Sequence, residues 1–418
     1  MQRSITILGL LLCIMMMPAR VLAHSMYQSS VLLDVQGREV HIELQLPPSR
    51  LGEALGLQLS AENLQAHAAE IQRYCVMNIM LRDERGRLWT LGAPSTPEWQ
   101  SVDGAPYVVM HMTSYAAADQ SSRRFQIEDH IITDKLPSHA ILVTVRSDWQ
   151  GSTFASDPNL VSILNGREPR ADVDLGTGSW MKGFTSVFRL GTRHIAEGTD
   201  HLLFLMVLLL PAPLAFAGRR WSGPVASSRS VWRIVAIATA FTVGHSCTLA
   251  LATFNVLHVP ERPIEALIAL SIFVSAIHAL RPLFPGREAF IAAGFGWIHG
   301  LAFATTLADL GLRGWDRGLA LLAFNLGIEA MQILVILCIL PSLVLLSRTR
   351  FYTAFRCAGA AFALLVSVGW MIERVSLRTL GVDRVVNALA QEAPWFALSL
   401  FGASVLLYGT RRLPLTRS

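Results

Sequence analysis

Residues 193–210 read RHIAEGTDHLLFLMVLLL, a stretch in which two histidines and two carboxylates precede an uninterrupted apolar run. A continuous helix rotates by about 100° per residue, so it would place His194, Glu197 and His201 within roughly 60° of one another. Asp200 lies at the edge of the same face. Acidic residues are favoured at the start of a helix, but that preference does not explain two histidines on one stripe. The stretch therefore predicts a membrane-spanning helix with a cluster of metal ligands at one end.

The composition places much of the chain in lipid. Of its 418 residues, 52% are hydrophobic and only 16% are charged, whereas a soluble domain usually carries about 25% charged residues. Mean hydropathy is +0.43, and nearly all the long apolar runs lie after Val187. Because a membrane helix needs about 20 mostly apolar residues, we expect an α-helical polytopic membrane bundle with about seven spans. These are residues 187–210, 231–256, 264–281, 289–309, 318–346, 353–373 and 393–410.

The first 23 residues have the three parts of a secretory signal peptide. Arg3 supplies positive charge, Ile5–Met17 forms an apolar run, and Ala23 ends a cleavage motif. The run is shorter than a membrane span, so cleavage is expected rather than an uncleaved first helix. Cleavage would leave His24 at the new N-terminus, where the amine and imidazole could chelate a metal ion, most naturally copper. His24 is thus a candidate second metal site, unless it merely follows the cleavage point.

Residues 24–180 have the composition of a globular domain, which the signal peptide would export. Short β-rich runs separated by turn residues predict a β-rich, sandwich-like fold with one inserted helix. The predicted strands are residues 31–34, 40–46, 76–82, 88–91, 107–113, 124–132 and 140–147, and the predicted helix is 61–71. Residues 151–180 are rich in Gly, Ser, Asp, Asn and Pro and are typical of an irregular connector. The membrane domain then begins at residue 181.

Histidines and one cysteine are scattered through the exported domain. Cys75 is its only cysteine, so no internal disulfide is expected. Histidines on strands are usually structural or solvent-exposed, so the sequence assigns none of them as a ligand. They are His41, His67, His111, His130 and His139.

The loops between the apolar runs agree with an exported N-terminal domain. Loops that would then be cytoplasmic carry more arginine than the exported loops, as the positive-inside rule requires. The cytoplasmic set is Arg219, Arg220, Arg229, Arg233, Arg281, Arg287, Arg348, Arg350, Arg356, Arg411, Arg412 and Arg417. We therefore expect a bacterial inner-membrane protein with a cytoplasmic C-terminus. The sixth and seventh spans are the least secure, and a six-span bundle with a re-entrant or interfacial piece is the alternative.

Further polar residues fall inside the later predicted spans. They are Thr242, His245, Ser246 and Thr248, then Ser271, Ser275 and His278, then His299, then Asn325, Glu329 and Gln332. A buried ionisable group costs roughly 2.5–3.5 kcal/mol in mid-membrane, so several of them favour a shared site or pathway over isolated helix–helix hydrogen bonds. Imidazole suits Ni, Co, Cu, Zn and Fe, and carboxylates extend the choice towards Mn. The candidate ligands are His194, Glu197, Asp200, His201, His245, His299 and Glu329.

Two motifs in this half resemble the HupE/UreJ family of hydrogenase and urease accessory membrane proteins. The first is the His-x5-Asp-His arrangement of His194, Asp200 and His201, and the second is Ile298-His299-Gly300 followed by Ala302-Phe303-Ala304. The resemblance covers roughly residues 184–346. It is closest to the longer branch with an exported N-terminal domain, whose members are regarded as nickel or cobalt permeases that feed metalloenzyme assembly. The resemblance implies a metal but does not fix which one.

The leading hypothesis is a transition-metal permease that is not an enzyme. It would bind or transport a divalent ion, nickel or cobalt, with no tightly bound cofactor and with metalloenzyme maturation proteins as partners. The alternatives are an accessory protein that presents metal to a metalloenzyme and a membrane metalloenzyme. The arginines lie in loops rather than in a patch with aromatics, which argues against nucleic-acid binding. Gly244, Gly300 and Gly327 lie beside the polar residues, where they could allow the backbone adjustments of a gated path.

Overall fold

The structure is a computed structural model that describes residues 28–117, 119, 122–253, 260–303, 307, 310–376 and 380–410. The expected signal peptide and His24 lie outside these residues. The chain forms two compact units. The first contains residues 38–144 and 160–173 together with the chain before Asp34, and the second contains residues 34–37, 145–159 and 174–418.

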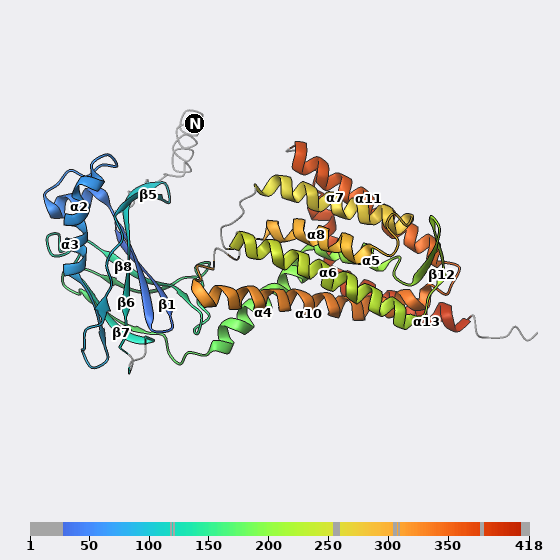
Figure 1. The fold of residues 1–418 in the computed structure, drawn as a ribbon, viewed down its shortest axis with the longest axis horizontal. Coiled ribbons are helices and arrows are strands. Elements are labelled where there is room, and N and C mark those ends of the chain that lie inside the picture. Colours follow the sequence, from blue (N-terminus) through green and yellow to red (C-terminus); the bar gives the residue numbers. More distant parts are fainter. Residues whose placement is uncertain are drawn as a thin grey trace, which may run out of the picture. The chain divides into compact units, whose positions relative to one another are not determined.

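The N-terminal region is rich in β-strands, as predicted, and its strands form two sheets (Figure 1). One sheet has seven strands in the order β4-β6-β2-β1-β8-β9, with β5 paired to β6, and the other has the order β10-β7-β3. The strands are β1 Ser29–Gln36, β2 Glu39–Leu46, β3 Ile79–Asp83, β4 Thr90–Leu91, β5 Glu98–Val102, β6 Ala105–Tyr115, β7 Arg124–Asp129, β8 Ile141–Asp148, β9 Asn159–Leu164 and β10 Arg170–Asp174. β1 and β2 correspond to the predicted strands 31–34 and 40–46 and form a hairpin. Its turn contains Gly37 at a φ of +59°, a conformation that suits glycine.

The helices of this region depart from the prediction. The predicted helix at residues 61–71 forms later, as a 3-10 turn η1 (Leu64–His67) followed by α3 (Ala68–Asn78). The helix therefore includes Val76–Asn78, which local β propensity had assigned to a strand. A second helix, α2 (Pro48–Leu55), was not predicted; it begins with proline at its first position, where the missing N–H costs nothing. The expected connector also contains β9 and β10.

The C-terminal unit is built from helices, and four of those described are long and apolar enough to cross a membrane. They are α6 (Ser227–Thr253), α7 (Glu261–Leu280), α10 (Gly314–Leu346) and α11 (Tyr352–Ser376). Each corresponds to one predicted span. Their buried faces share one apolar core, in which residues such as Ile234, Ile272 and Leu343 are almost fully buried.

Seven spans are not confirmed. The fourth predicted span is represented by α8 (Glu288–Ala302), which has 15 residues, and the seventh by α13 (Ala393–Thr410), whose apolar part is shorter than 18 residues. An amphipathic helix that was not predicted, α12 (Val382–Gln391), precedes α13. A short hairpin of β11 (Leu214–Ala217) and β12 (Arg220–Pro224) precedes α6.

The first predicted span is broken rather than continuous. It consists of α4 (Trp180–Glu197) and α5 (Thr199–Leu209), separated at Gly198, whose backbone is extended with φ −74° and ψ 94°. The expectation of one uninterrupted helix through residues 193–210 was therefore wrong. The tetrapeptide Glu197–Asp200 explains the break, because glycine weakens a helix interior and Thr and Asp are favoured where a new helix begins.

Candidate metal site in the membrane region

The break at Gly198 positions three of the candidate ligands. His194 lies in the last turn of α4, while Asp200 and His201 lie in the first turn of α5. A Cβ at residue 198 would lie 2.4 Å from the His194 carbonyl oxygen and 3.0 Å from His201 Nδ1. Only glycine fits this corner without displacing a ligand.

Glycines also bring the neighbouring helices into backbone contact. On the α6–α8 interface, a Cβ at Gly296 would lie 2.1 Å from the Phe241 carbonyl oxygen, and one at Gly300 would lie 2.3 Å from the His245 carbonyl oxygen. On the α4–α10 interface, a Cβ at Gly327 would lie 2.1 Å from the Phe188 carbonyl oxygen. Small residues commonly allow such close packing between membrane helices. The glycines expected to lend flexibility thus serve as close-packing positions, and they hold His245 and His299 beside α4 and α5.

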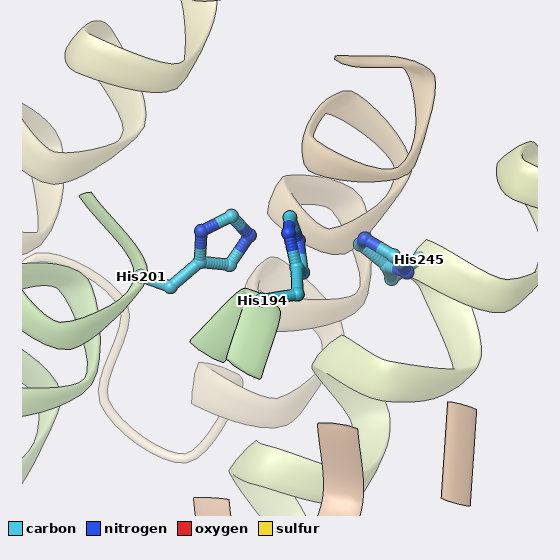
Figure 2. A group of neighbouring side chains, drawn as sticks. All are labelled: His194, His201 and His245. Carbon is cyan, nitrogen blue, oxygen red and sulfur yellow. The ribbon is translucent and has the colours of Figure 1, made fainter. Parts of the chain in front are cut away.

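The four imidazoles converge from four helices. The ring centroids are 4.5 Å apart for His194 and His201, 6.0 Å for His194 and His245, and 5.0 Å for His201 and His299. Figure 2 shows the rings of His194, His201 and His245 side by side, each from a separate ribbon segment. Two groups have ligand atoms within 4.8 Å of one another and could each hold a metal ion: His194, His201 and His245, and Asp200, His201 and His299. His201 belongs to both groups.

The site is buried, and several of its ring nitrogens lack hydrogen bonds. His245 and His299 are fully buried, and His201 is 6% exposed. The buried nitrogens without a hydrogen-bond partner are His194 Nε2, His201 Nε2, His245 Nδ1 and Nε2, and His299 Nδ1. An unsatisfied buried polar atom costs about 1–3 kcal/mol, so a cluster of them calls for an explanation. A bound metal ion would explain them, because it would accept the lone pairs of these ring nitrogens.

Two side chains orient the imidazoles. Asp200 Oδ1 lies 2.8 Å from His201 Nδ1 and also accepts a hydrogen bond from the His201 backbone N–H. The Ser271 hydroxyl lies 3.0 Å from His299 Nε2, leaving Nδ1 of that ring unpaired. Partners of this kind on the second ring nitrogen are typical of histidines that bind metal.

Aromatic rings form the walls of the site, and sequence reasoning did not predict them. The Phe303 and Phe324 rings lie 4.0 and 5.5 Å from the His194 ring, and the two phenylalanines stack on each other. Phe204 and Phe241 lie 5.3 and 5.0 Å from the His299 ring. Apolar walls lower the local dielectric, which strengthens the interaction between a bound cation and the Asp200 carboxylate.

The structure does not bring every candidate ligand into this cluster. Glu197 is exposed at the end of α4 and belongs to neither group. Glu329 also lies outside both groups; its Oε1 accepts a hydrogen bond from Thr239 on α6, while its Oε2 is buried without a partner. His24 is not among the described residues.

The family comparison matches the same part of the chain. Residues 170–374 match the family model described as HupE / UreJ protein, a stretch that contains all five clustered residues. Among curated proteins and solved structures, the searches find no match. The match and the apolar helices together indicate a membrane protein. The matched family suggests a role in metal transport or as an accessory protein. Residues 170–374 thus match the HupE/UreJ family model, which confirms the family that the two motifs of the membrane half resemble.

Proposed function

We propose that the protein is a transition-metal permease, with nickel or cobalt as its substrate, and that the cluster is its ion-binding site. The observation that carries the proposal is the convergence of His194, Asp200, His201, His245 and His299, with several ring nitrogens buried and unpaired. Imidazole nitrogen with one carboxylate suits Ni and Co better than the hard cations Mg and Ca. No cysteine belongs to either described group, which disfavours the thiolate-bound ions.

The two groups that share His201 offer an ion two adjacent positions. An ion held by His194, His201 and His245 moves to Asp200 and His299 by exchanging its other ligands while His201 stays bound. Transport requires sites that bind strongly enough to load and weakly enough to release. Overlapping groups meet this requirement because no single step strips the ion of all its ligands.

Polar side chains continue beyond the cluster on α10. Asn325, Glu329 and Gln332 follow one another at helical spacing, and Asn325 Oδ1 and Glu329 Oε2 are buried without partners. On the facing helix α6, Thr239 donates to Glu329 and Thr242 to Gln332. Figure 1 shows α6 and α10 running alongside each other. We assign this row of oxygens to the path that the ion follows after leaving the imidazoles.

The proposal includes the orientation that the sequence favours. The N-terminal region is exported, the C-terminus is cytoplasmic and the membrane is the bacterial inner membrane. The arginine distribution and the expected signal peptide support this arrangement. A family of metal transport and accessory proteins supports a role in supplying metalloenzymes rather than in catalysis.

Two acids three residues apart provide a matched test. Asp200 contacts His201 Nδ1, whereas Glu197 is exposed outside the cluster. In proteoliposomes loaded with a metal-sensitive dye, Asp200→Asn should lower Ni²⁺ and Co²⁺ uptake at least about tenfold, because ligand changes and second-shell changes typically cost 10- to 100-fold. Glu197→Gln should leave uptake unchanged. Equal losses in both variants, or none in Asp200→Asn, would refute the site assignment.

The β-rich N-terminal region favours one alternative, an accessory protein that binds metal and presents it to a metalloenzyme without moving it across the membrane. The same vesicles distinguish the two functions. A permease gives saturable accumulation inside, while a presenting protein binds the ion at equilibrium and gives none.

A further inference from the structure

A groove lies between α6 and α10, outside the imidazole cluster. It has a volume of about 390 Å³, and all but one of the side chains that line it are apolar. Val231 and Val235 line it from α6, while Leu337, Leu340 and Pro341 line it from α10. Apolar walls offer no ligand to an ion and no hydrogen bond to water. The groove is therefore not a continuation of the row of oxygens on α10.

The groove opens at the surface of the helix bundle. The Val231 and Leu337 side chains on its rim are 42% and 64% exposed. Both belong to helices that are long and apolar enough to cross a membrane. Exposed apolar side chains on such helices contact the acyl chains of the bilayer. The chemistry of the groove therefore fits the acyl tail of a lipid.

One end of the groove coincides with the ends of both helices. Ser227, the first residue of α6, and Leu345, in the last turn of α10, both line the groove. The Arg348 backbone N–H donates to the Leu345 carbonyl oxygen at 3.2 Å, a 3-10 spacing that aligns the two side chains on one side of the turn. Arg348 therefore lies just past this end of the groove, where a spanning helix leaves the hydrocarbon core. One N–H of its guanidinium donates to the Tyr408 hydroxyl at 3.4 Å.

The sequence around this end of the groove is positively charged. Residues 225–236 and 341–351 contain no acidic residue and four arginines, of which Arg233 is paired with Glu288 of α8. Because a guanidinium has five N–H donors, Arg348 can bind a phosphate while it contacts its tyrosine partner. Basic residues at the ends of membrane helices attract anionic lipid headgroups. The charge at this end of the groove thus complements a phosphate.

We propose that the groove, with Arg348 at its end, is a binding site for one anionic phospholipid. The acyl tail lies along the groove between α6 and α10, and the phosphate contacts Arg348. Acyl tails of the surrounding bilayer are as apolar as the groove, so the tail alone gives little preference for this place. The headgroup charge supplies the selectivity, and the groove fixes the position. The site stands whether or not the membrane region transports ions.

The experiment measures lipid binding to the full chain in detergent by native mass spectrometry. Phosphatidylglycerol and phosphatidylcholine with the same acyl tails are compared, so that only the headgroup differs. The wild type should bind phosphatidylglycerol at least about threefold more tightly, and Arg348→Gln should abolish this preference. Val231→Trp places an indole where the acyl tail would lie. It should weaken phosphatidylglycerol binding at least about tenfold, because the filled groove has no room for both.

Two variants serve as matched controls. Val243 is 57% exposed on α6 and does not line the groove, and Arg281 is exposed at the end of α7. Val243→Trp and Arg281→Gln should therefore bind both lipids as the wild type does. Far-UV circular dichroism checks that each variant is folded.

Four results would overturn the proposal. The wild type binds both lipids equally, or Val231→Trp binds phosphatidylglycerol as tightly as Val243→Trp does. Alternatively, Arg281→Gln loses the preference as fully as Arg348→Gln. A wild-type dimer that Val231→Trp splits into monomers, with lipid binding unchanged, would assign the groove to a second copy of the chain instead. None of these results bears on uptake of ions, so this proposal and the permease fail separately.

Discussion

Replacing Gly198 with alanine should damage the membrane cluster without removing any ligand. The new Cβ would lie 2.4 Å from the His194 carbonyl oxygen, 3.0 Å from His201 Nδ1 and 3.3 Å from Asp200 Oδ1. Real Cβ contacts essentially never fall below 3.0 Å, so α4 and α5 must separate by about 0.6 Å at this point. Forcing a methyl group into a packed site costs about 1–3 kcal/mol. If this strain distorts the cluster, it corresponds to a loss of about 5- to 150-fold in affinity.

The assay is Ni²⁺ binding to the purified chain, measured by calorimetry. Gly294→Ala is the control, because Gly294 lies on α8, the helix of His299, and its Cβ would meet nothing within 4 Å. Gly294→Ala should retain wild-type affinity. If Gly198→Ala binds Ni²⁺ within about twofold of the wild type, the break in the helix does not position the ligands and the reasoning fails.

Three further predictions concern packing, ligand orientation and pH. Gly296→Ala places a Cβ 2.1 Å from a carbonyl oxygen of α6, so it should destabilise the α6–α8 pair by about 1–3 kcal/mol, measurable as a lower unfolding temperature in detergent. Ser271→Ala removes the 3.0 Å partner of His299 Nε2 and should weaken Ni²⁺ binding about 10- to 100-fold with the fold intact; unchanged affinity would rule out an orienting role. Burial, with a smaller contribution from a nearby arginine, lowers the pKa of His139 from 6.5 to about 4. The unfolded chain then binds this proton more readily than the folded chain between pH 6.5 and 4. Stability contributed by the neutral ring should therefore fall by about 2 kcal/mol from pH 7 to 5. Hydrogen exchange of β1, where Ser29 pairs with His139, should show the loss in the wild type and not in His139→Gln.

Periodicity predicted the fold best where one physical effect dominates. The long apolar runs of α6, α7, α10 and α11 have no stable alternative to a membrane helix, and the structure has helices there. The strands of the β1–β2 hairpin were equally predictable. Apolar and polar residues alternate along β2, and a glycine lies in the turn before it. The strand assigned to Val76–Asn78 was wrong because local β propensity was outweighed by continuation of α3 from the preceding turn. Strands β9 and β10 were missed because they lie in the turn-rich stretch 151–180, whose composition conceals a strand pattern. β9 pairs with the preceding strand β8, and β10 pairs with the more distant β7.

The candidate site was predicted in part. His194, Asp200 and His201 were grouped by assuming a continuous helix; the structure brings them together through a break instead, which also explains why Glu197 is excluded. The contributions of His245 and His299 depend on the close approach of helices that are distant in the chain. The sequence shows the glycines at these helix–helix contacts, but it does not show which backbone atoms of the neighbouring helix they contact. The phenylalanine walls had no local signal, because aromatic residues are common in any membrane helix.

The most direct test of the central claim is ion uptake by proteoliposomes that contain the wild-type chain or His201→Ala. His201 is the one residue common to both described groups, so its loss removes a ligand from each position that an ion could occupy. We predict saturable uptake of Ni²⁺ or Co²⁺ by the wild type and none above background for His201→Ala. Uptake that is unchanged in His201→Ala would contradict the account, because the ion would then cross the membrane without the imidazole cluster.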